Sequence, residues 1–246
     1  YIGGAMTALE HLNMKGVAVL FALLTGVCAF GIGCGVQSNA IADVIYTNYQ
    51  IPVVVTALVV AILTAIVILG GVQSISNVCE KLVPFMSLFY VVGCLYILFY
   101  NCAYLGETIS LIVTSAFTPR AAMGGFVGST LMIAARYGIA RGLFSNESGM
   151  GSAPIVAAAS QSRNSVRIAL ISSTGVFWDT VVVCLMTGLV LVSSIIANDA
   201  VSSVGLEGGQ LASLTFAQIP VVGTPLLVFG VMTFAFSTIL GWYYYG

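Results

Sequence analysis

The segment ARGLFSNESGMGSAPIVAAA, residues 140–159, places polar and charged side chains in one of the most apolar parts of the sequence. Three of its residues are glycines, which weaken a helix, and its serine and asparagine side chains can hydrogen-bond freed backbone groups. Pro154 suits the first turn of a helix, because its missing N–H has no helical partner there. The pattern predicts two half-helices separated by a non-helical break from Gly142 to Gly151.

A break of this kind could bind a small charged solute. The helix after the break would present free N–H groups and the positive end of its dipole, which suit a carboxylate. The helix before it would end in free carbonyl groups, which suit a cation. A zwitterionic amino acid together with a metal cation fits both ends, and secondary transporters bind their solutes at such breaks. The alternative is a kink with only a structural role.

Ionisable side chains inside a bilayer are functional candidates, and Arg141, Glu147 and Asp179 are among those within the apolar runs. We expect Arg141 and Glu147 to pair with each other or with the backbone and so to hold the two half-helices together. Direct contact with a substrate is the alternative for this pair. Asp179 has three interpretations, namely a cation ligand or relay, a partner of Arg141 or another arginine, and a protonated hydrogen-bond donor within the packing.

The composition predicts the solvent of the chain and excludes two classes of function. Hydrophobic residues make up 59% of the 246 residues and charged residues 6%, and the mean hydropathy is +1.09. So little polar surface cannot cover a water-soluble fold, so we expect a lipid bilayer. Seven Lys and Arg with a net charge of −1 provide no basic surface for a nucleic acid. The sequence contains no HExxH, GxSxG or GxGD motif, so we do not expect an enzyme.

Six apolar runs are long enough to cross the hydrocarbon core as helices, which takes about 20 residues. They are Val17 to Ile45, Pro52 to Gly71, Leu82 to Asn101, Met123 to Ser160, Ile168 to Ala197 and Val221 to Tyr245. As one helix, the fourth run would be roughly 57 Å long, nearly twice the ~30 Å core, so it has to bend or stop. The runs lack the period of two that a barrel strand requires. They predict an all-α, polytopic membrane helix bundle.

The basic residues of the connections predict the orientation of the spans. Threading the chain in alternation collects Lys15, Lys81, Arg163 and Arg167 on one side and leaves Arg120 on the other. Because Lys and Arg collect on the cytoplasmic side, the first span should run from inside to outside. Two apolar stretches in the outer connections, 108–117 and 211–218, are too short to cross. They could be lids over an external mouth or helices partly buried against the bundle.

Five motifs occur in order along the sequence. They are GIGCGVQSN at Gly31, EKLVPFM at Glu80, RGLFSNESGMGSAPI at Arg141, FWDT at Phe177 and FAFSTILGWYYYG at Phe234. With these motifs, the sequence resembles the alanine or glycine:cation symporter family of bacteria and archaea over nearly its whole length. The resemblance implies a five-plus-five inverted-repeat, LeuT-like fold with a discontinuous helix. The six spans would be its third to eighth core helices, with the break in the sixth.

The same resemblance implies the domain organisation and the activity. Residues 1–246 would form a single transmembrane domain, an internal piece of a longer chain whose first and last helices lie outside it. The activity would be sodium-coupled symport of small neutral amino acids across the plasma membrane. L-alanine and glycine would be the substrates, with D-alanine left open, and sodium would be the coupling ion, with no other cofactor. A passive channel or a non-transporting membrane scaffold protein is the alternative.

The resemblance also implies site residues. The substrate would bind to Gln37, Phe144, Ser145, Asn146, Thr238 and Trp242. Sodium would bind to Phe234, Ser237 and Thr238, because a hard cation prefers hydroxyl and carbonyl oxygen. Thr238 and Trp242 are four positions apart and share a helix face, where the indole would limit the volume of the substrate. Ordinary bonding of the hydroxyls within their own helix is the alternative. Cys34 stands where the family commonly has an amide side chain.

Overall fold

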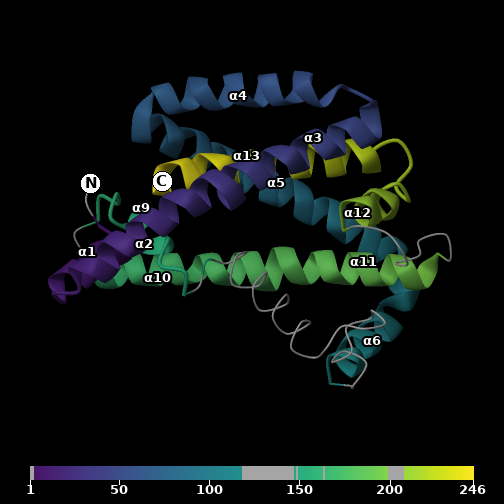
Figure 1. Ribbon diagram of the computed structural model, residues 1–246. Helices are drawn as coiled ribbons and strands as arrows, with labels where there is room; N and C mark the ends of the chain where they lie inside the picture. The colour runs from purple at the N-terminus through teal and green to yellow at the C-terminus, as the bar shows by residue number, and fades with distance from the viewer. Residues whose placement is uncertain (1–2, 118–146, 148, 163, 199–207) are drawn as a thin grey trace, which may run out of the picture. The chain divides into compact units, whose positions relative to one another are not determined.

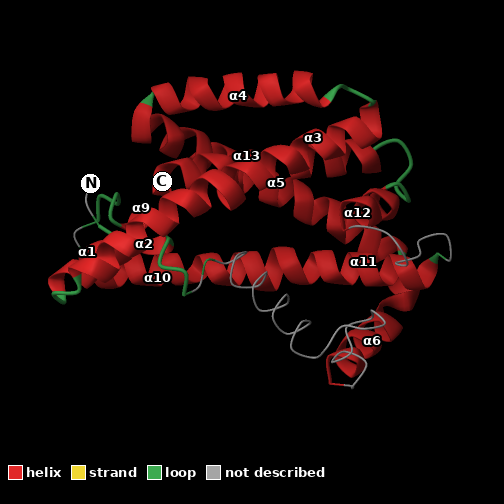
Figure 2. Cartoon of the chain, in the orientation of Figure 1, coloured by secondary structure: helices red, strands yellow, loops and turns green. Residues whose placement is uncertain are grey.

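The computed structural model describes residues 3–117, 147, 149–162, 164–198 and 208–246. Every regular element in this part of the chain is a helix (Figures 1 and 2). Four helical runs are long and apolar enough to cross a membrane, namely Lys15–Tyr49, Gly71–Tyr100, Ser165–Ala197 and Gly223–Tyr245. The all-α prediction and four of the expected spans are therefore confirmed. The first half of the interrupted run lies outside the described residues.

The chain divides into two compact units, which are described separately. The first comprises Tyr1–Gly93, Pro154–Gln161 and Phe216–Gly246, and the second comprises Cys94–Ala153 and Ser162–Thr215. The helices of the first unit are α1 (Ala5–His11), α2 (Lys15–Cys28), η1 (Ala29–Gly35), α3 (Val36–Tyr49), α4 (Val53–Leu69), the first part of α5 (Gly71–Tyr100), most of α9 (Ala153–Ala157) and α13 (Gly223–Tyr245). α2, η1 and α3 form one helical run, in which η1 is π-helical.

Local sequence signals end the helices of the first unit. α3 ends at Gln50, which has a left-handed φ of 56°, and Pro52 precedes α4. α4 has 17 residues, at the lower limit for a span. The chain then reverses at Gly70 and Gly71, and the φ of +71° at Gly71 favours glycine. As a result, the start of α2, the α4–α5 turn and the end of α13 lie at the same end of the unit (Figure 1).

The third span begins earlier than the sequence predicted. Leu82 was the expected start, but α5 runs without a break from Gly71 to Tyr100 and includes Pro84. Hydropathy reports where a helix leaves the hydrocarbon, not where it ends, and the polar residues before Leu82 are compatible with a helix. At 30 residues, α5 is about 45 Å long and extends past a core of about 30 Å.

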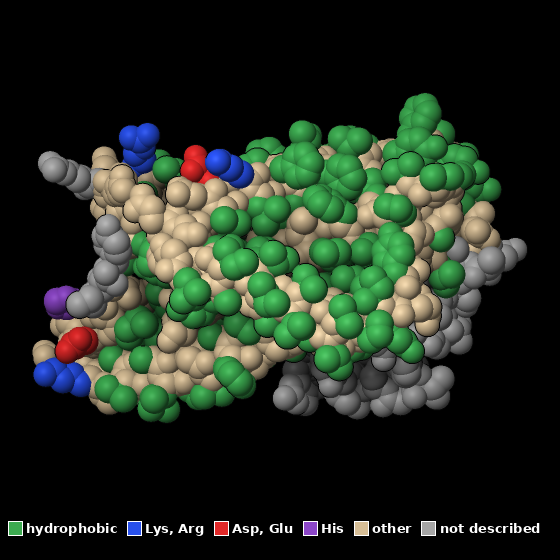
Figure 3. All heavy atoms as spheres, turned by 90° about the horizontal axis from the view of Figure 1, so that it is seen from above, with side chains coloured by type: hydrophobic (Ala, Val, Ile, Leu, Met, Phe, Trp, Pro, Cys, Tyr) green, Lys and Arg blue, Asp and Glu red, His purple; other side chains and the backbone are tan. Residues whose placement is uncertain are grey.

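α13 is the central helix of the first unit. In its most apolar stretch 44% of the residues are buried, against 17% to 22% in the other three long runs. Its residues Val228, Ala235 and Ile239 pack into a core cluster with residues of α3 and α4. Elsewhere large apolar side chains are exposed, and Figure 3 shows them covering one face while charged side chains gather at one end. This distribution fits a protein whose solvent is lipid.

The second unit contains the end of α5, η2 (Cys102–Tyr104), α6 (Leu105–Phe117), α10 (Ser165–Val176), η3 (Phe177–Cys184), α11 (Leu185–Ala197) and most of α12 (Gly208–Phe216). α10 begins where the Asn164 side chain accepts hydrogen bonds from the N–H groups of Val166 and Arg167, at 3.0 and 3.2 Å. η3 is a second π-helical stretch inside a long helix. Asn101 Nδ2 donates to Ser194 Oγ at 3.3 Å, which joins α11 to the end of α5. The two short apolar stretches of the connections fall in α6 and α12.

We expect Gly223→Ala to destabilise the protein. A Cβ at Gly223 would overlap the Phe216 carbonyl oxygen and come within 2.8 Å of its carbonyl carbon, so the turn before α13 would have to move. We expect a loss of roughly 1–3 kcal/mol in the free energy of unfolding. Gly230→Ala, on the same helix, is the control, because its Cβ would meet Tyr90 at an ordinary 3.6 Å. Thermal unfolding in detergent should separate the two variants, and equal melting temperatures would contradict the prediction.

Candidate functional site

Three oxygen atoms of α13 converge in the segment that the sequence assigns to sodium. Ser237 Oγ and Thr238 Oγ1 each donate a hydrogen bond to the Phe234 carbonyl oxygen at 2.9 Å. All three residues are half-buried. A hydroxyl oxygen keeps its lone pairs while it donates, so these atoms could turn toward a cation. The same bonds are expected if these hydroxyls only bond within their own helix, which is the alternative to a sodium site. Thr233 makes such a bond to the Phe229 carbonyl oxygen at 2.8 Å.

Ser237 and Phe234 lie on the side of α13 that contacts α5. Ser237 Oγ is 3.8 Å from Met86 Sδ, and the ring of Phe234 meets Tyr90 edge to face with a centroid distance of 5.6 Å. The same interface continues at Phe229, whose ring is 5.2 Å from Phe89. Two of the three predicted sodium residues therefore lie beside α5, an element that the resemblance did not implicate in the site.

Trp242, which the sequence assigns to the substrate, packs against η1. Its side chain is only 3% exposed, and a Cβ added to Gly33 would come within 2.7 Å of its Cδ2 atom. The ring of Tyr245 covers it from another side, edge to face at 5.2 Å. Gly33 is therefore required for the close approach of the two helices. The repeated glycines of GIGCG were a signal for such an approach, but they do not identify the partner.

The contact of η1 and α3 with α13 brings Gln37 to the level of Thr238. Gly33 faces Trp242, while Cys34 Sγ lies 3.9 Å from the Ile239 carbonyl oxygen, so the two helices run antiparallel. Gln37 follows Gly33 by one turn, and Thr238 precedes Trp242 by one turn. Both side chains are half-buried. The structure thus brings together the segments that carry three of the six predicted substrate residues.

The described part of the break is not helical. Glu147, Gly149 and Gly151 have φ values of 56°, 78° and 80°, and the hydrogen bond from Met150 N to Glu147 O closes a turn at 3.3 Å. Ser152 Oγ donates to Glu147 Oε2 at 2.9 Å. This bond fixes the carboxylate within the turn itself. The predicted break, Gly142 to Gly151, is confirmed as non-helical at Glu147 and 149–151.

The helix that follows the break is shorter than predicted. α9 has five residues, with Pro154 as its second, and the chain leaves the helix well before Ser160. The apolar APIVAAA sequence suggested a longer half-helix, but apolar composition does not fix helix length. So short a helix aligns few peptide dipoles.

The structure does not test the remaining predicted residues. Arg141, Phe144, Ser145 and Asn146 lie outside the described residues, so the proposed pairing of Arg141 with Glu147 remains a prediction. Asp179 lies in η3 and is half-buried. Sequence reasoning missed that both FWDT and GIGCG fall in π-helical stretches, an irregularity that often marks functional sites.

The whole sequence, residues 1–246, matches the model of the sodium:alanine symporter family. The chain belongs to this family. It is 46% identical over 99% of its length to an uncharacterized transporter of Haemophilus influenzae, and 41% identical over 99% to the sodium/alanine symporter AgcS of Methanococcus maripaludis. A probable sodium/glutamine symporter of Bacillus subtilis, GlnT, is 32% identical over 99%. The chain spans 54%, 54% and 50% of these relatives, or about half of their length.

Membership of the sodium:alanine symporter family confirms two predictions. The family is one of transporters, so the chain is not an enzyme. With several apolar helices long enough to cross a bilayer, it is part of a multi-pass membrane protein. Among the described residues no group of three or more His, Cys, Asp or Glu side chains could hold a metal ion.

Proposed function

We propose that the protein is a sodium-coupled symporter of small neutral amino acids, with alanine and glycine as substrates, in the plasma membrane of a bacterium or an archaeon. The convergence of the Phe234, Ser237 and Thr238 oxygens is the observation that carries the proposal. The donor set is one carbonyl and two hydroxyl oxygens, which suits a hard monovalent cation better than a transition metal. The name of AgcS, a sodium/alanine symporter, supports the same ion and substrate.

The substrate would bind next to this cation. Its ammonium group would lie near Gln37 and Thr238, its side chain against Phe144 and Trp242, and its carboxylate near free N–H groups of the break. Because α9 is short, side chains such as Ser145 and Asn146 would have to supply part of the carboxylate binding. One relative is named for glutamine, so local residues such as Trp242 would set the size limit in each member.

Transport would follow from movement around a fixed site, without covalent chemistry. The site would open to each side of the membrane in turn as one group of helices rocks against the other, in the five-plus-five scaffold expected from the resemblance. Sodium bound at α13 and the bound amino acid would favour the same state of the site, so each would raise the affinity for the other. Coupling of the two solutes would then require only that the site open to one side of the membrane and then to the other.

Uptake by the complete protein in liposomes tests the proposal. We expect radiolabelled alanine to accumulate when an inward sodium gradient is present, to saturate with alanine concentration, and to stop when potassium replaces sodium. A passive channel would conduct without sodium dependence and would not accumulate alanine. A scaffold protein would give no flux above that of empty liposomes. Either of these two results would overturn the symporter assignment.

A further inference from the structure

A polar stripe runs along the first turns of α5, outside the site described above. Gln73, Ser76, Asn77 and Glu80 follow one another at spacings of three, one and three residues, which places them on one face of the helix. All four side chains are exposed. In the described part of the chain, the side chains of Gln73, Asn77 and Glu80 make no hydrogen bond or ion pair with the protein. They are thus free to bind a solute.

This stripe forms one wall of a groove within the first unit. The groove has a volume of about 690 Å³. Its other walls come from Ser160 and Gln161 after α9 and from Gly241 and Tyr244 of α13. Nothing lies within 4 Å of the position of a Cβ at Gly241, so the missing side chain leaves room beside Tyr244. Small-molecule sites occupy about 300–1,000 Å³, so an amino acid with its water fits here.

The groove lies at the end of the unit that the basic residues assign to the cytoplasm. Lys15 and Lys81 belong to this end, whereas the connections at the opposite end, 46–53 and 217–223, contain no Lys or Arg. Because Lys and Arg collect on the cytoplasmic side, the groove opens inward. The start of α2, the α4–α5 turn and the end of α13 meet at this end (Figure 1).

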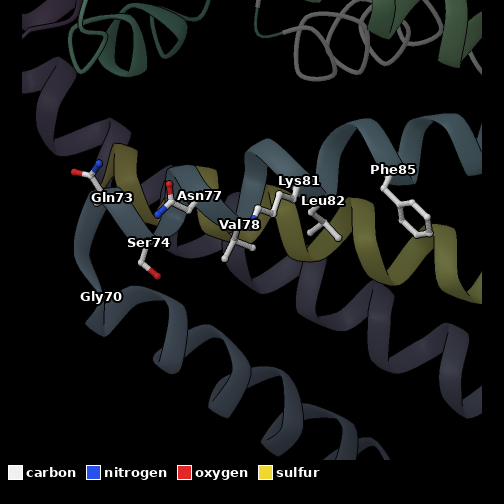
Figure 4. A pocket seen from close by; sticks show the side chains of 8 residues that line it. All are labelled: Gly70, Gln73, Ser74, Asn77, Val78, Lys81, Leu82 and Phe85. Carbon is white, nitrogen blue, oxygen red and sulfur yellow. The ribbon is translucent and has the colours of Figure 1, made fainter.

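The charges on α5 are divided between two grooves. Glu80 lines the groove just described, but Lys81 does not. Lys81 lines a second groove of about 710 Å³ on the neighbouring face of α5, together with Ser74 and Phe85 (Figure 4). The two grooves share Gln73 and Asn77, which lie between them. The Glu80 groove therefore carries a single carboxylate with amide groups around it, and no cation among its described lining residues neutralises that carboxylate.

Side chains one turn apart match the two charges of an α-amino acid. The Cβ atoms of Asn77 and Glu80 should be about 5–6 Å apart. A carboxylate accepts from an ammonium group, and the amide N–H groups of Asn77 and Gln161 donate to a carboxylate. We infer that the Glu80 groove is a cytoplasmic subsite for the zwitterionic amino acid, in which Glu80 binds the ammonium group of the substrate as it leaves the central site. The inference rests on the proposed transport function.

Transport from each side of the membrane tests the subsite. In right-side-out and inside-out vesicles that contain the complete protein, Glu80→Gln should raise the alanine concentration for half-maximal exchange at the cytoplasmic face by about threefold. The value at the outer face should stay unchanged. Lys81→Gln changes the residue next to Glu80 in the sequence, but Lys81 lines the other groove, so this variant should change neither value. The inference is wrong if Glu80→Gln and Lys81→Gln change the half-maximal alanine concentration alike, or if Glu80→Gln changes it equally at both faces of the membrane.

Labelling of Cys79 tests binding without transport. Cys79 lines the same groove, and a variant that keeps only this cysteine provides a probe at the site. We expect a membrane-impermeant methanethiosulfonate to modify Cys79 from the cytoplasmic side. In the Lys81→Gln variant, alanine should slow this modification by at least about twofold. In the Glu80→Gln variant, alanine should not slow it. Labelling that ignores alanine would overturn the subsite. Absence of sodium-dependent uptake by the unmodified protein, with alanine protection retained, would instead overturn the proposed function alone.

Discussion

Thr238→Val should raise the sodium concentration needed for half-maximal alanine uptake by about tenfold or more. Valine has nearly the shape of threonine but no hydroxyl oxygen, so the change removes one of the three oxygens that converge at Phe234. An interaction with a charged group is worth about 1.5–3 kcal/mol, which corresponds to roughly 10–150-fold in affinity. Sodium titration of uptake in proteoliposomes measures the shift.

Thr233→Val is the matched control for this change. Thr233 lies on the same helix, is 8% exposed and makes the same bond to the carbonyl four residues earlier, at 2.8 Å. If the hydroxyls serve only their own helix, both variants should transport with the same sodium dependence. A rise in the half-maximal sodium concentration that is confined to Thr238→Val supports a cation site. Combining Ser237→Ala with Thr238→Val should then raise this concentration further. An unchanged sodium dependence in Thr238→Val would exclude Thr238 as a ligand.

Trp242→Ala should let the protein accept bulkier amino acids and should also lower its stability. The indole is 3% exposed and fills the space between Gly33 and Tyr245. Removing a buried tryptophan costs about 3–5 kcal/mol in the free energy of unfolding. If the ring also limits the substrate site, competition of alanine uptake by valine or leucine should become at least about tenfold stronger, since one or two methylene groups carry that much discrimination.

Two further variants separate the structural role of Trp242 from its role in selection. Leu240→Ala removes another fully buried side chain of α13, so it should lower the melting temperature without changing the order of competing amino acids. Trp242→Phe leaves a smaller ring in place and should shift selection with a smaller loss of stability. If Trp242→Ala lowers stability but alanine and glycine remain preferred as before, the substrate pocket lies elsewhere.

The sequence by itself determined the features that depend on local composition. Long apolar runs with 6% charged residues require helices in lipid, because every backbone group must find a partner within its own segment. The starts or ends of α4, α10 and α13 fall within a few residues of their predicted positions. The non-helical segment before Pro154 was equally predictable, since the glycines that take φ values near 80° act through their own backbone.

Only the tertiary structure decided which residues meet. Cys34 and Ile239 lie 205 positions apart, and no local pattern reports that η1 packs on the end of α13 or that Gly33 makes room for Trp242. The true start of α5 and the shortness of α9 also required the structure, because hydropathy measures preference for lipid and not the length of a helix. The groove that Glu80 lines exists only because α13 and the segment from α9 to Gln161 pack beside α5. Such contacts join segments far apart in the chain, so their energy is absent from any window of the sequence.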